Sequence, residues 1–339
     1  MRKASDSKIG EIVVDAVRRY DAAMPGVLPA SPNDEVERYL TTPLRAYLSA
    51  SGKRLRPLLC ELGCELVGGE RETVTALGCA IESFHTAALI HDDIEDGGTT
   101  RRGLPAYHIA EGTPGGINAG DYGLALAFGQ VLACPDLAPD LRIRIMGEFV
   151  ETAKRTIEGQ AVDLGWTRDG TLDMTVGDCL FVAEAKTAYY TCAAPLAVGA
   201  LAGGGTEEEA ETLRQVGTWA GIAFQLKDDL LNLEAGASGG KDSLSDLYEG
   251  KRTAIIAHGL THSPRADELH GMLTKGVSTE AEAQDVLALL REAGSLAYVE
   301  HLSADYCARA KDRLLEAFPE SSARNTLVAL IDYIHTRMR

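Results

Sequence analysis

Apolar residues recur along the chain with the spacing of helices. Leu40, Leu44 and Leu48 are four residues apart, and a similar rhythm of three and four runs through 81–89 and 213–224. This spacing places apolar side chains on one face of a helix, which can then pack against its neighbours. Alternation of polar and β-branched residues, the pattern of half-buried strands, is hard to find anywhere in the sequence. The chain is therefore predicted to be all-α.

Short segments rich in glycine or proline separate the predicted helices, because these residues interrupt regular structure. They lie at 68–69, 97–98, 133–140, 203–205 and 235–240. The stretches between them suit helices of roughly 12 to 25 residues. Two of these stretches, 73–96 and 207–233, are apolar on most faces, which indicates burial in the middle of a bundle. We expect residues 1–339 to form one domain, a single large helical bundle.

The composition is that of an ordinary globular protein, with 45% hydrophobic and 24% charged residues. The formal net charge of −17 should repel nucleic acid and anionic membranes, so a ligand with phosphate would need local cations or a metal. The seven cysteines lack CxxC spacing and are expected to be buried thiols in a reducing compartment. Cys60 and Cys64 share a helical face, but no other type of metal ligand accompanies them, so no zinc site is predicted.

The sequence shows no recognisable targeting or membrane-spanning segment. Its first twenty residues, MRKASDSKIGEIVVDAVRRY, contain two early cations but no apolar region of the kind found in signal peptides. No stretch reaches about 18 consecutive apolar residues. We therefore expect a cytoplasmic protein with no integral membrane span and no nucleic-acid partner.

The first of two acidic clusters ends the sequence LIHDDIED. Asp92 and Asp96 are four residues apart, so a helix would place both carboxylates on one face, about 6 Å apart along its axis. Asp93 would lie about 100° round the same helix. Carboxylates stacked beside an apolar core repel one another unless cations compensate. Magnesium suits such a site, because it binds one or two carboxylates and takes its other ligands from water and phosphate.

The second acidic cluster, in FQLKDDLLNLE, repeats the spacing with Asp228, Asp229 and Asn232. Either cluster could instead be a solvated helix end, which is the usual setting of acidic runs. The apolar residues before each cluster argue against that alternative, since both clusters emerge from helices predicted to be buried. We therefore interpret the acids as metal ligands, with the metal holding phosphate and the apolar run holding an attached tail.

Cationic residues are few but occur in short motifs. SGKRLRP places Gly52, Lys53, Arg54 and Arg56 in a loop that enters a helix at its amino end, where anions are favoured. The remaining cations in such motifs are Arg101, Arg102, Lys186, Lys241 and Lys251. Each alone could be ordinary surface charge. Together they allow two anionic groups to be bound, one through metal and one by side chains alone.

Seven motifs occur in the same order as in a known family. They are GKRLRP, FHTAALIHDD, DDIED followed by RRG, NAGD, EGQAVDL, AKT, and FQLKDDLLN followed by GKDSLSDLYEGK, and they span Gly52 to Thr253. In these motifs the sequence resembles the trans-isoprenyl (polyprenyl) diphosphate synthases, such as farnesyl and geranylgeranyl diphosphate synthases. The resemblance implies an all-α isoprenoid-synthase fold, one large bundle with a central active-site cavity, and a homodimer.

The resemblance also implies roles for individual residues. Magnesium, three ions per active site, would be bound by Asp92, Asp96 and Asp228, with Asp93 and Asp229 in support. The five aspartates, with Arg101 and Lys186, would be the catalytic residues. The allylic diphosphate site would be completed by Arg101, Lys186, Thr187, Gln225, Lys241 and Lys251. Isopentenyl diphosphate would bind without metal to Lys53, Arg56, His85 and Arg102. Without its motif, His85 would be interpreted as a hydrogen-bonded core histidine.

The chemistry of prenyl transfer agrees with these roles. Breaking an allylic carbon–oxygen bond releases diphosphate, whose developing charge magnesium and fixed cations neutralise. The carbocation that remains needs a pocket from which water is excluded. The double bond of isopentenyl diphosphate then attacks the cation and a proton is lost. No side chain is an obvious general base, so the hypothesis implied by the resemblance is that the departing diphosphate takes the proton.

One position departs from the common pattern of the family. Asn232 stands where the family often has a third aspartate, and an amide offers metal only one neutral oxygen. Metal binding through this position should therefore be weaker or absent. Some geranylgeranyl diphosphate synthases of the family carry the same asparagine, so the departure is compatible with activity.

Residues ahead of the first acidic cluster are expected to set the length of the product. Ala87 and Ala88 are small, whereas a bulky aromatic at the first of these positions typically stops the chain at fifteen carbons in the family. Phe84 would lie about 12 Å along the helix axis from Asp92. We expect Phe84 to form a floor and the main product to have twenty carbons, and Ala87→Tyr to shorten it. The alternative for Phe84 is ordinary core packing.

Two other functions fit parts of the sequence. A terpene cyclase also ionises an allylic diphosphate with magnesium, but it needs no second diphosphate site, so Lys53, Arg56 and Arg102 argue against it. A regulatory subunit of a heteromeric synthase tends to lose acidic ligands. Five of the six acidic-cluster positions are aspartate here, which favours an active enzyme.

Overall fold

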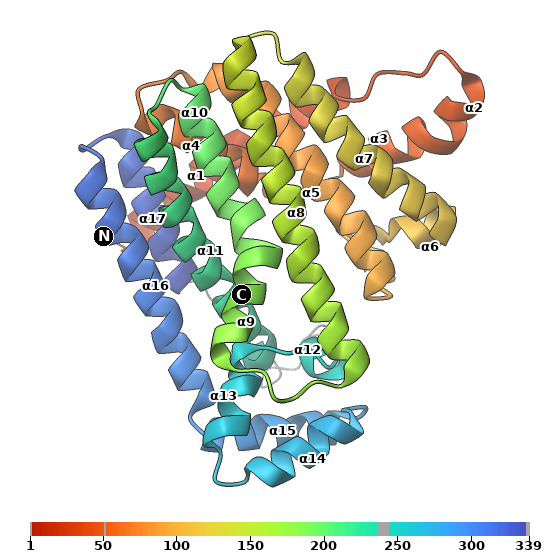
Figure 1. Cartoon of the computed structure of the whole chain (residues 1–339), viewed down its shortest axis with the longest axis vertical. Coiled ribbons are helices and arrows are strands. Elements are labelled where there is room, and N and C mark those ends of the chain that lie inside the picture. The colour runs from red at the N-terminus through yellow and green to blue at the C-terminus, as the bar shows by residue number, and fades with distance from the viewer. Residues whose placement is uncertain (1, 51, 236–243, 337–339) are drawn as a thin grey trace. The chain divides into compact units, whose positions relative to one another are not determined.

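The computed structural model describes residues 2–50, 52–235 and 244–336, and these are almost entirely helical (Figure 1). The chain packs into two compact units. Unit 1 consists of Met1–Val150, Ala194–Leu213 and Phe318–Ala329, and unit 2 of Glu151–Ala193, Arg214–Ala317 and Leu330–Arg339. The all-α prediction is confirmed. That residues 1–339 form a single domain stays a prediction.

Unit 1 contains most helices of the first half of the chain, together with α10, the start of α11 and part of α17. The helices that begin in this unit are α1 (Arg2–Ala23), α2 (Asp34–Val36), α3 (Thr42–Leu48), α4 (Leu55–Leu66), α5 (Thr75–Glu95), α6 (Tyr107–Glu111), α7 (Thr113–Ala133), α8 (Pro139–Asp169), α10 (Ala194–Ala202), α11 (Glu207–Ala235) and α17 (Ser322–Thr336), with the short turns η1 (Met24–Gly26), η2 (Glu37–Thr41) and η3 (Arg71–Val74). Three of them, α8, α11 and α17, end in unit 2.

Helix α5 is the central element of unit 1. It packs against α3, α4, α6, α7 and α10, and its apolar residues are buried on most faces, as the sequence predicted. The predicted helix 73–96 begins two residues later, because η3 precedes it, and it ends at Glu95. At this end of the helix Asp92 and Asp96 reach solvent, whereas Asp93 stays buried.

Helices α4 and α10 approach so closely that only glycine fits at the crossing. A Cβ atom on Gly63 would lie 2.2 Å from the carbonyl oxygen of Leu196, and one on Gly199 would lie 1.9 Å from that of Cys60. This packing fixes α4, and with it the SGKRLRP loop at the amino end of α4. It also explains the cysteines of α4, which line the crossing. All seven cysteines are buried thiols, as predicted.

Unit 2 contains the second half of the chain and its own apolar core. Its elements are the carboxyl-terminal parts of α8, α11 and α17, with α9 (Val176–Val182), η4 (Ala183–Ala193), α12 (Ser245–Tyr248), α13 (Ala254–His262), α14 (Ala266–Lys275), α15 (Glu280–Glu292) and α16 (Ser295–Ala317). The core joins Leu226 and Leu230 of α11 to Ile255, Leu287 and Val299. At 31 residues, α8 is longer than the 12 to 25 residues expected, because the glycines within it do not end the helix. Helix α11 extends two residues beyond the predicted 207–233.

A π-helical segment, η4, lies against α8 in unit 2. A Cβ on Gly159 of α8 would be 2.4 Å from the backbone nitrogen of Lys186, so glycine is required there for the two segments to touch. π-Helical turns occur often at functional sites, because they turn side chains out of the regular α-helical register. Here the wide turn carries Lys186 and Thr187 of the AKT motif.

A two-stranded hairpin follows the first acidic cluster and was not predicted. Strands β1 (Thr100–Arg101) and β2 (Leu104–Pro105) are antiparallel, and two residues per strand are too few to show an alternating pattern. The turn between them has positive φ at Arg102 (52°) and Gly103 (78°), as in a tight hairpin turn. Arg102 is thereby held at the tip of the hairpin.

One segment of the described chain, Arg71–Glu95, is long and apolar enough to cross a membrane by length and composition alone. This segment is η3 together with α5, and 72% of its apolar window is buried inside the structure. Such burial is usual for the core helix of a bundle, so the segment is weak support for a membrane span.

Candidate active site

The first acidic cluster occupies the last turn of α5 in unit 1. The amide of Asp96 donates to the carbonyl oxygen of Asp92 (2.9 Å), so the four-residue spacing is realised on a helix, as predicted. The carboxyl end of a helix is the negative end of its dipole, which disfavours additional negative charge. Three carboxylates at this position therefore require cations nearby.

Asp93 differs from its two neighbours in this cluster. It is fully buried and accepts hydrogen bonds from the Tyr47 hydroxyl (3.0 Å) and from Nε of Arg101 (2.8 Å). Arg101 also lies 3.3 Å from Asp92. Solvent reaches Asp92 and Asp96 but not Asp93. Asp93 thus orients Arg101, and its support of a bound metal stays a prediction.

The cluster suits a metal that is shared with a ligand. Among the residues that the structure describes, no group of three or more His, Cys, Asp or Glu side chains is arranged to hold a metal by itself. Magnesium commonly binds one or two carboxylates and completes its octahedron with water and phosphate oxygens. The two solvent-accessible carboxylates on one face of α5 match that donor set. They are too few to bind a metal ion through protein side chains alone.

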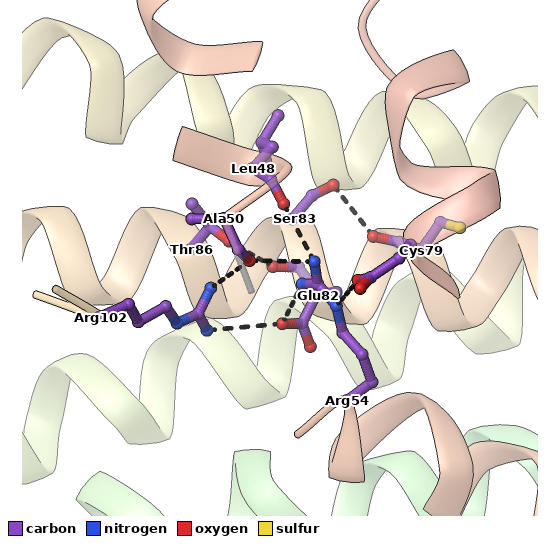
Figure 2. A network of polar contacts seen from close by, with 9 residues as sticks. Leu48, Ala50, Arg54, Cys79, Glu82, Ser83, Thr86 and Arg102 are labelled. Carbon is purple, nitrogen blue, oxygen red and sulfur yellow. Dashed lines mark hydrogen bonds and ion pairs between the residues drawn. The ribbon is translucent and has the colours of Figure 1, made fainter. Parts of the chain in front are cut away.

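Figure 2 shows a buried network of ionic and polar contacts beside the same helix, with Glu82 at its centre. The guanidinium of Arg54 donates to Glu82 (2.7 Å), to Asp21 (2.9 Å) and to the carbonyl oxygen of Ala50 (3.1 Å). The side chain of Arg54 has no exposed surface, and that of Glu82 is 2% exposed. Arg54 is therefore a structural residue that fixes the loop before α4.

Arg102 reaches the same network from the hairpin, as Figure 2 shows. Its guanidinium lies 3.6 Å from Glu82 and donates to the carbonyl oxygen of Ala50 at 3.4 Å, so both contacts are long. A Cβ on Gly52 would lie 3.3 Å from this guanidinium, so a larger residue there would crowd Arg102. Burial lowers the pKa of Arg102, and Glu82 partly opposes this shift. Arg102 is loosely held and able to bind an anion.

His85 lies on α5 one turn beyond Glu82 and is buried. Burial lowers its pKa well below the usual value, and the positive charges of Arg56 and Arg102 lower it further. The imidazole is therefore neutral near pH 7. Arg56, His85 and Arg102 thus gather around one stretch of α5, as predicted, and Lys53 is exposed in the adjoining loop. The binding of isopentenyl diphosphate there stays a prediction.

A pocket in unit 2 gathers most of the residues predicted to bind the allylic diphosphate. Its lining includes Lys186 and Thr187 of η4, Gln225 and Asp229 of α11, and Lys251 before α13. Of the other two residues predicted for this site, Lys241 lies outside the described residues, and Arg101 belongs to unit 1 and does not line this pocket. Solvent reaches Asp228, the predicted metal ligand of α11, whereas Asp229 is buried.

Carboxylates hold both lysines of this pocket in place. Nζ of Lys186 lies 2.5 Å from Asp163 of α8, and Nζ of Lys251 lies 3.6 Å from Asp229 and 3.5 Å from Asp246. Burial raises the pKa of Asp229 to about 6, although Lys251 lowers it. Burial also opposes the charge of Lys251, but Asp229 and Asp246 raise its pKa overall, so this lysine stays cationic. Cations fixed in this way suit a diphosphate.

Sequence reasoning missed the partner carboxylates, namely Glu82, Asp163 and Asp246. Asp163 and Asp246 stand inside the motifs EGQAVDL and GKDSLSDLYEGK, which were noted without a role for either residue. Glu82 is a lone charge in the apolar run ALGCAIESFHTAALI, and an unpaired carboxylate in a buried helix would be costly. A lone acidic residue in an apolar run was therefore the sequence signal that could have identified Glu82 as a buried, paired carboxylate.

The expected chain-length residues lie on α5 ahead of the acidic cluster. Phe84, Ala88 and Asp92 follow one another at intervals of four residues and so lie along one side of the helix. Phe84 is buried, whereas Ala88 is partly exposed. Ala87 is fully buried, and a Cβ on Gly123 of α7 would lie 3.0 Å from its methyl group, so Ala87 faces α7. That these residues set product length stays a prediction.

The fold and the clustered charges together define a class, the all-α proteins that bind diphosphate-bearing ligands. Comparison with known proteins then identifies the family. Residues 37–290 match the model of the family described as polyprenyl synthetase. The geranylgeranyl diphosphate synthase of Methanosarcina mazei is 34% identical over 94% of this chain and 94% of its own length.

Solved structures of similar proteins support the same family. The crystal structure of geranylgeranyl pyrophosphate synthetase from Pyrococcus horikoshii Ot3 has a TM-score of 0.88 and 29% identity, covering 98% of this chain and 100% of that one. The geranylgeranyl pyrophosphate synthase from Corynebacterium glutamicum, complexed with isoprenyl diphosphate and magnesium, has a TM-score of 0.82 and 27% identity over 98% and 99%. The chain belongs to the polyprenyl synthetase family and is a prenyltransferase. The predicted isoprenoid-synthase type of fold is confirmed.

Proposed function

We propose that this prenyltransferase condenses isopentenyl diphosphate with an allylic diphosphate to give an all-trans C20 diphosphate, with release of inorganic diphosphate. The observation that carries the proposal is the presence of two distinct cationic sets. One, in unit 1, gathers Arg56, His85 and Arg102 around α5, and the other, in unit 2, gathers Lys186 and Lys251 around a pocket. A reaction between two diphosphates needs two such sets.

We propose magnesium as the metal, because a similar enzyme was solved with magnesium and because the accessible aspartates fit it. Asp92 and Asp96 of α5 would hold metal in unit 1, and Asp228 of α11 would hold it in unit 2. When bound, magnesium would supply Lewis-acid stabilisation of the leaving diphosphate. The number of ions, three, is part of the proposal and rests on the family resemblance.

The chain's own residues would perform the remaining work. Lys186 and Lys251 would bind the allylic diphosphate and neutralise its charge as the carbon–oxygen bond breaks and the bonding pair leaves with the oxygen. Arg56, Arg102 and the neutral His85 would bind the second diphosphate by charge and hydrogen bonds. A new carbon–carbon bond then forms from the double bond of isopentenyl diphosphate. The proton lost from the adjacent carbon would pass to the departing diphosphate.

The test of this proposal is product analysis. Purified protein would be incubated with magnesium, isopentenyl diphosphate and, separately, dimethylallyl, geranyl or farnesyl diphosphate, and the products would be separated by chain length after dephosphorylation. The expected result is a C20 product from all three starters. A main product of fifteen carbons, or of twenty-five and more, would contradict the proposed length, and the absence of any condensation would contradict the function.

Phe84→Ala should lengthen the product. Phe84 lies about 12 Å along α5 from Asp92, on the side shared with Ala88, so its removal would open space below a growing tail. The expected result is a shift of at least half of the product from C20 to C25 or longer, measured by chromatography. Ala88→Phe is the opposite change and should shift the product below C20. If the distribution of product lengths did not change in Phe84→Ala, the role of Phe84 would be core packing alone.

We also propose a homodimer. Unit 1 exposes several large apolar side chains on α6, α7 and the first part of α8, namely Ile109, Ile117, Tyr122, Leu132, Ile143 and Val150. We propose that these exposed apolar side chains contact a second copy of the chain. Light scattering should give twice the chain mass of 36.1 kDa. Leu132→Glu should halve that mass, and Leu315→Glu on α16 should not.

The proposed location is the cytoplasm. It is supported by the seven buried cysteines, which form no disulfide, because such thiols are typical of proteins in a reducing compartment. The proposed substrates, isopentenyl and allylic diphosphates, each carry an anionic, water-soluble diphosphate group. At a net charge of −17 the chain is not expected to bind nucleic acid.

A further inference from the structure

Asn232 of α11 is the one position of the two acidic clusters that is not an aspartate, and its side chain has defined partners. Its Nδ2 donates to Oγ of Ser245 (2.8 Å), and its Oδ1 accepts from the backbone N–H of Asp246 (3.3 Å). Its carbonyl oxygen accepts from the N–H of Leu244 (3.1 Å). Three contacts from one residue thus attach the segment 244–246 to α11.

The orientation of the amide follows from these partners. The N–H of Asp246 can only donate, so the atom that faces it must be the amide oxygen, and the nitrogen must then face Ser245. Turning the oxygen toward a metal would break the contact with Asp246 and rotate the nitrogen away from Ser245. In the orientation that these contacts fix, each end of the Asn232 amide is therefore already used in holding the segment 244–246.

That segment leads to a lysine of the unit 2 pocket. The N–H of Lys251 donates to the carbonyl oxygen of Asp246 (2.9 Å), and the Asp246 carboxylate lies 3.5 Å from Nζ of Lys251. Leu244 has a left-handed conformation (φ 66°), which is costly for a leucine unless its surroundings impose it. Asp246 and Leu244 are both buried. Asn232, Asp246 and Lys251 thus form one connected series from α11 to the pocket.

We infer that Asn232 is a positioning residue, which holds Asp246 and through it Lys251 in the pocket, and that it is not a metal ligand. This inference rests on the proposed function only in naming the ligand of Lys251 as the allylic diphosphate. An asparagine serves this purpose because one amide offers a donor to Ser245 and an acceptor to Asp246 together. In the second acidic cluster, Asp228 is therefore proposed to bind metal, whereas Asn232 holds Asp246 in position.

Two variants separate positioning from metal binding. Asn232→Ala removes both side-chain hydrogen bonds and should raise KM for the allylic diphosphate about tenfold, with KM for isopentenyl diphosphate and the magnesium concentration for half-maximal activity within about twofold of the parent. Asn232→Asp would restore a charged oxygen ligand, and we expect its magnesium requirement to stay within about twofold as well. A several-fold lower requirement in Asn232→Asp, or a several-fold higher one in Asn232→Ala, would overturn the inference.

A double-mutant cycle with Lys251→Met shows whether Asn232 acts through this lysine. When Lys251 is already absent, Asn232→Ala should raise KM for the allylic diphosphate by less than about twofold. If Asn232→Ala still raised KM for the allylic diphosphate tenfold in the Lys251→Met background, Asn232 would not act through Lys251, and its role would be merely structural or would involve another residue. Ser245→Ala removes one of the contacts and should give a smaller effect in the same direction as Asn232→Ala.

A measurement without substrates keeps this inference separate from the proposed function. Amide hydrogen exchange at Leu244 and Asp246 should be at least tenfold faster in Asn232→Ala than in the parent. The Asp246 amide loses its acceptor, Oδ1 of Asn232, and the Leu244 amide, which donates to the backbone carbonyl of residue 232, lies in the segment that the side chain would no longer hold. Exchange elsewhere in α11 should be unchanged. If exchange at these amides does not change, Asn232 does not hold the segment, whatever reaction the protein catalyses.

Discussion

Asp92→Asn lowers kcat by about a thousandfold, the largest effect expected of any single change in this protein. The substitution keeps the shape of the side chain but removes the charge that would bind metal at the end of α5. A thousandfold corresponds to about 4 kcal/mol of transition-state stabilisation, which is a reasonable contribution for a metal ligand. The measurement is steady-state kinetics with both diphosphates and magnesium at saturation.

The matched control for this change is Glu95→Gln. Glu95 stands in the same last turn of α5 and is exposed, and it has no proposed role in the active site. It loses the same charge as Asp92→Asn, so it should keep at least half of the activity. Asp92 also lies 3.3 Å from Arg101, and loss of that contact alone is worth far less than a thousandfold. Should Asp92→Asn keep more than a tenth of the parental kcat, the metal role of this residue would be wrong.

Glu82→Ala lowers the free energy of unfolding by about 3–5 kcal/mol, the largest expected effect on stability. The change removes the carboxylate that lies 2.7 Å from the fully buried guanidinium of Arg54 and 3.6 Å from that of Arg102. The fully buried guanidinium of Arg54 and the largely buried one of Arg102 would then repel each other. Urea unfolding followed by circular dichroism measures the loss, and Glu82→Gln should lose less because the amide still accepts a hydrogen bond.

Glu72→Ala is the surface control for Glu82→Ala. Glu72 is 75% exposed and lies 3.6 Å from Arg71, so its ion pair is screened by water. Its removal should cost no more than about 1 kcal/mol. Equal losses in Glu72→Ala and Glu82→Ala would show that the network in Figure 2 does not stabilise unit 1. If Glu82→Ala were less stable but bound isopentenyl diphosphate as before, its role would be limited to stability.

The long helices could be predicted from the sequence because they carry enough apolar residues to show a period. Both α5 and α11 begin and end within two residues of the prediction. The hairpin formed by β1 and β2 could not be predicted, since two residues per strand carry no pattern. The length of α8 was underestimated because Gly147, Gly159 and Gly165 lie inside that helix and do not end it.

The candidate sites could be predicted in part. Cationic residues in short motifs such as GKRLRP, RRG and AKT identified the cations, and four-residue spacing identified the acids. The partners of those cations come from other elements: Glu82 is 28 residues from Arg54, and Asp163 is 23 residues from Lys186. Sequence spacing carries no information about such tertiary pairs. For the same reason, Arg54 could not be distinguished from Arg56 in GKRLRP, although the structure shows that Arg54 is wholly committed to structural contacts.

An assay in which components are omitted tests most directly whether this protein joins two diphosphates. Purified protein would be given farnesyl diphosphate, carbon-labelled isopentenyl diphosphate and magnesium, and then the same mixture lacking each component in turn. The account predicts a labelled C20 diphosphate from the complete mixture and no product when any component is missing. A hydrocarbon formed from farnesyl diphosphate and magnesium alone, or no product from the complete mixture, would contradict it.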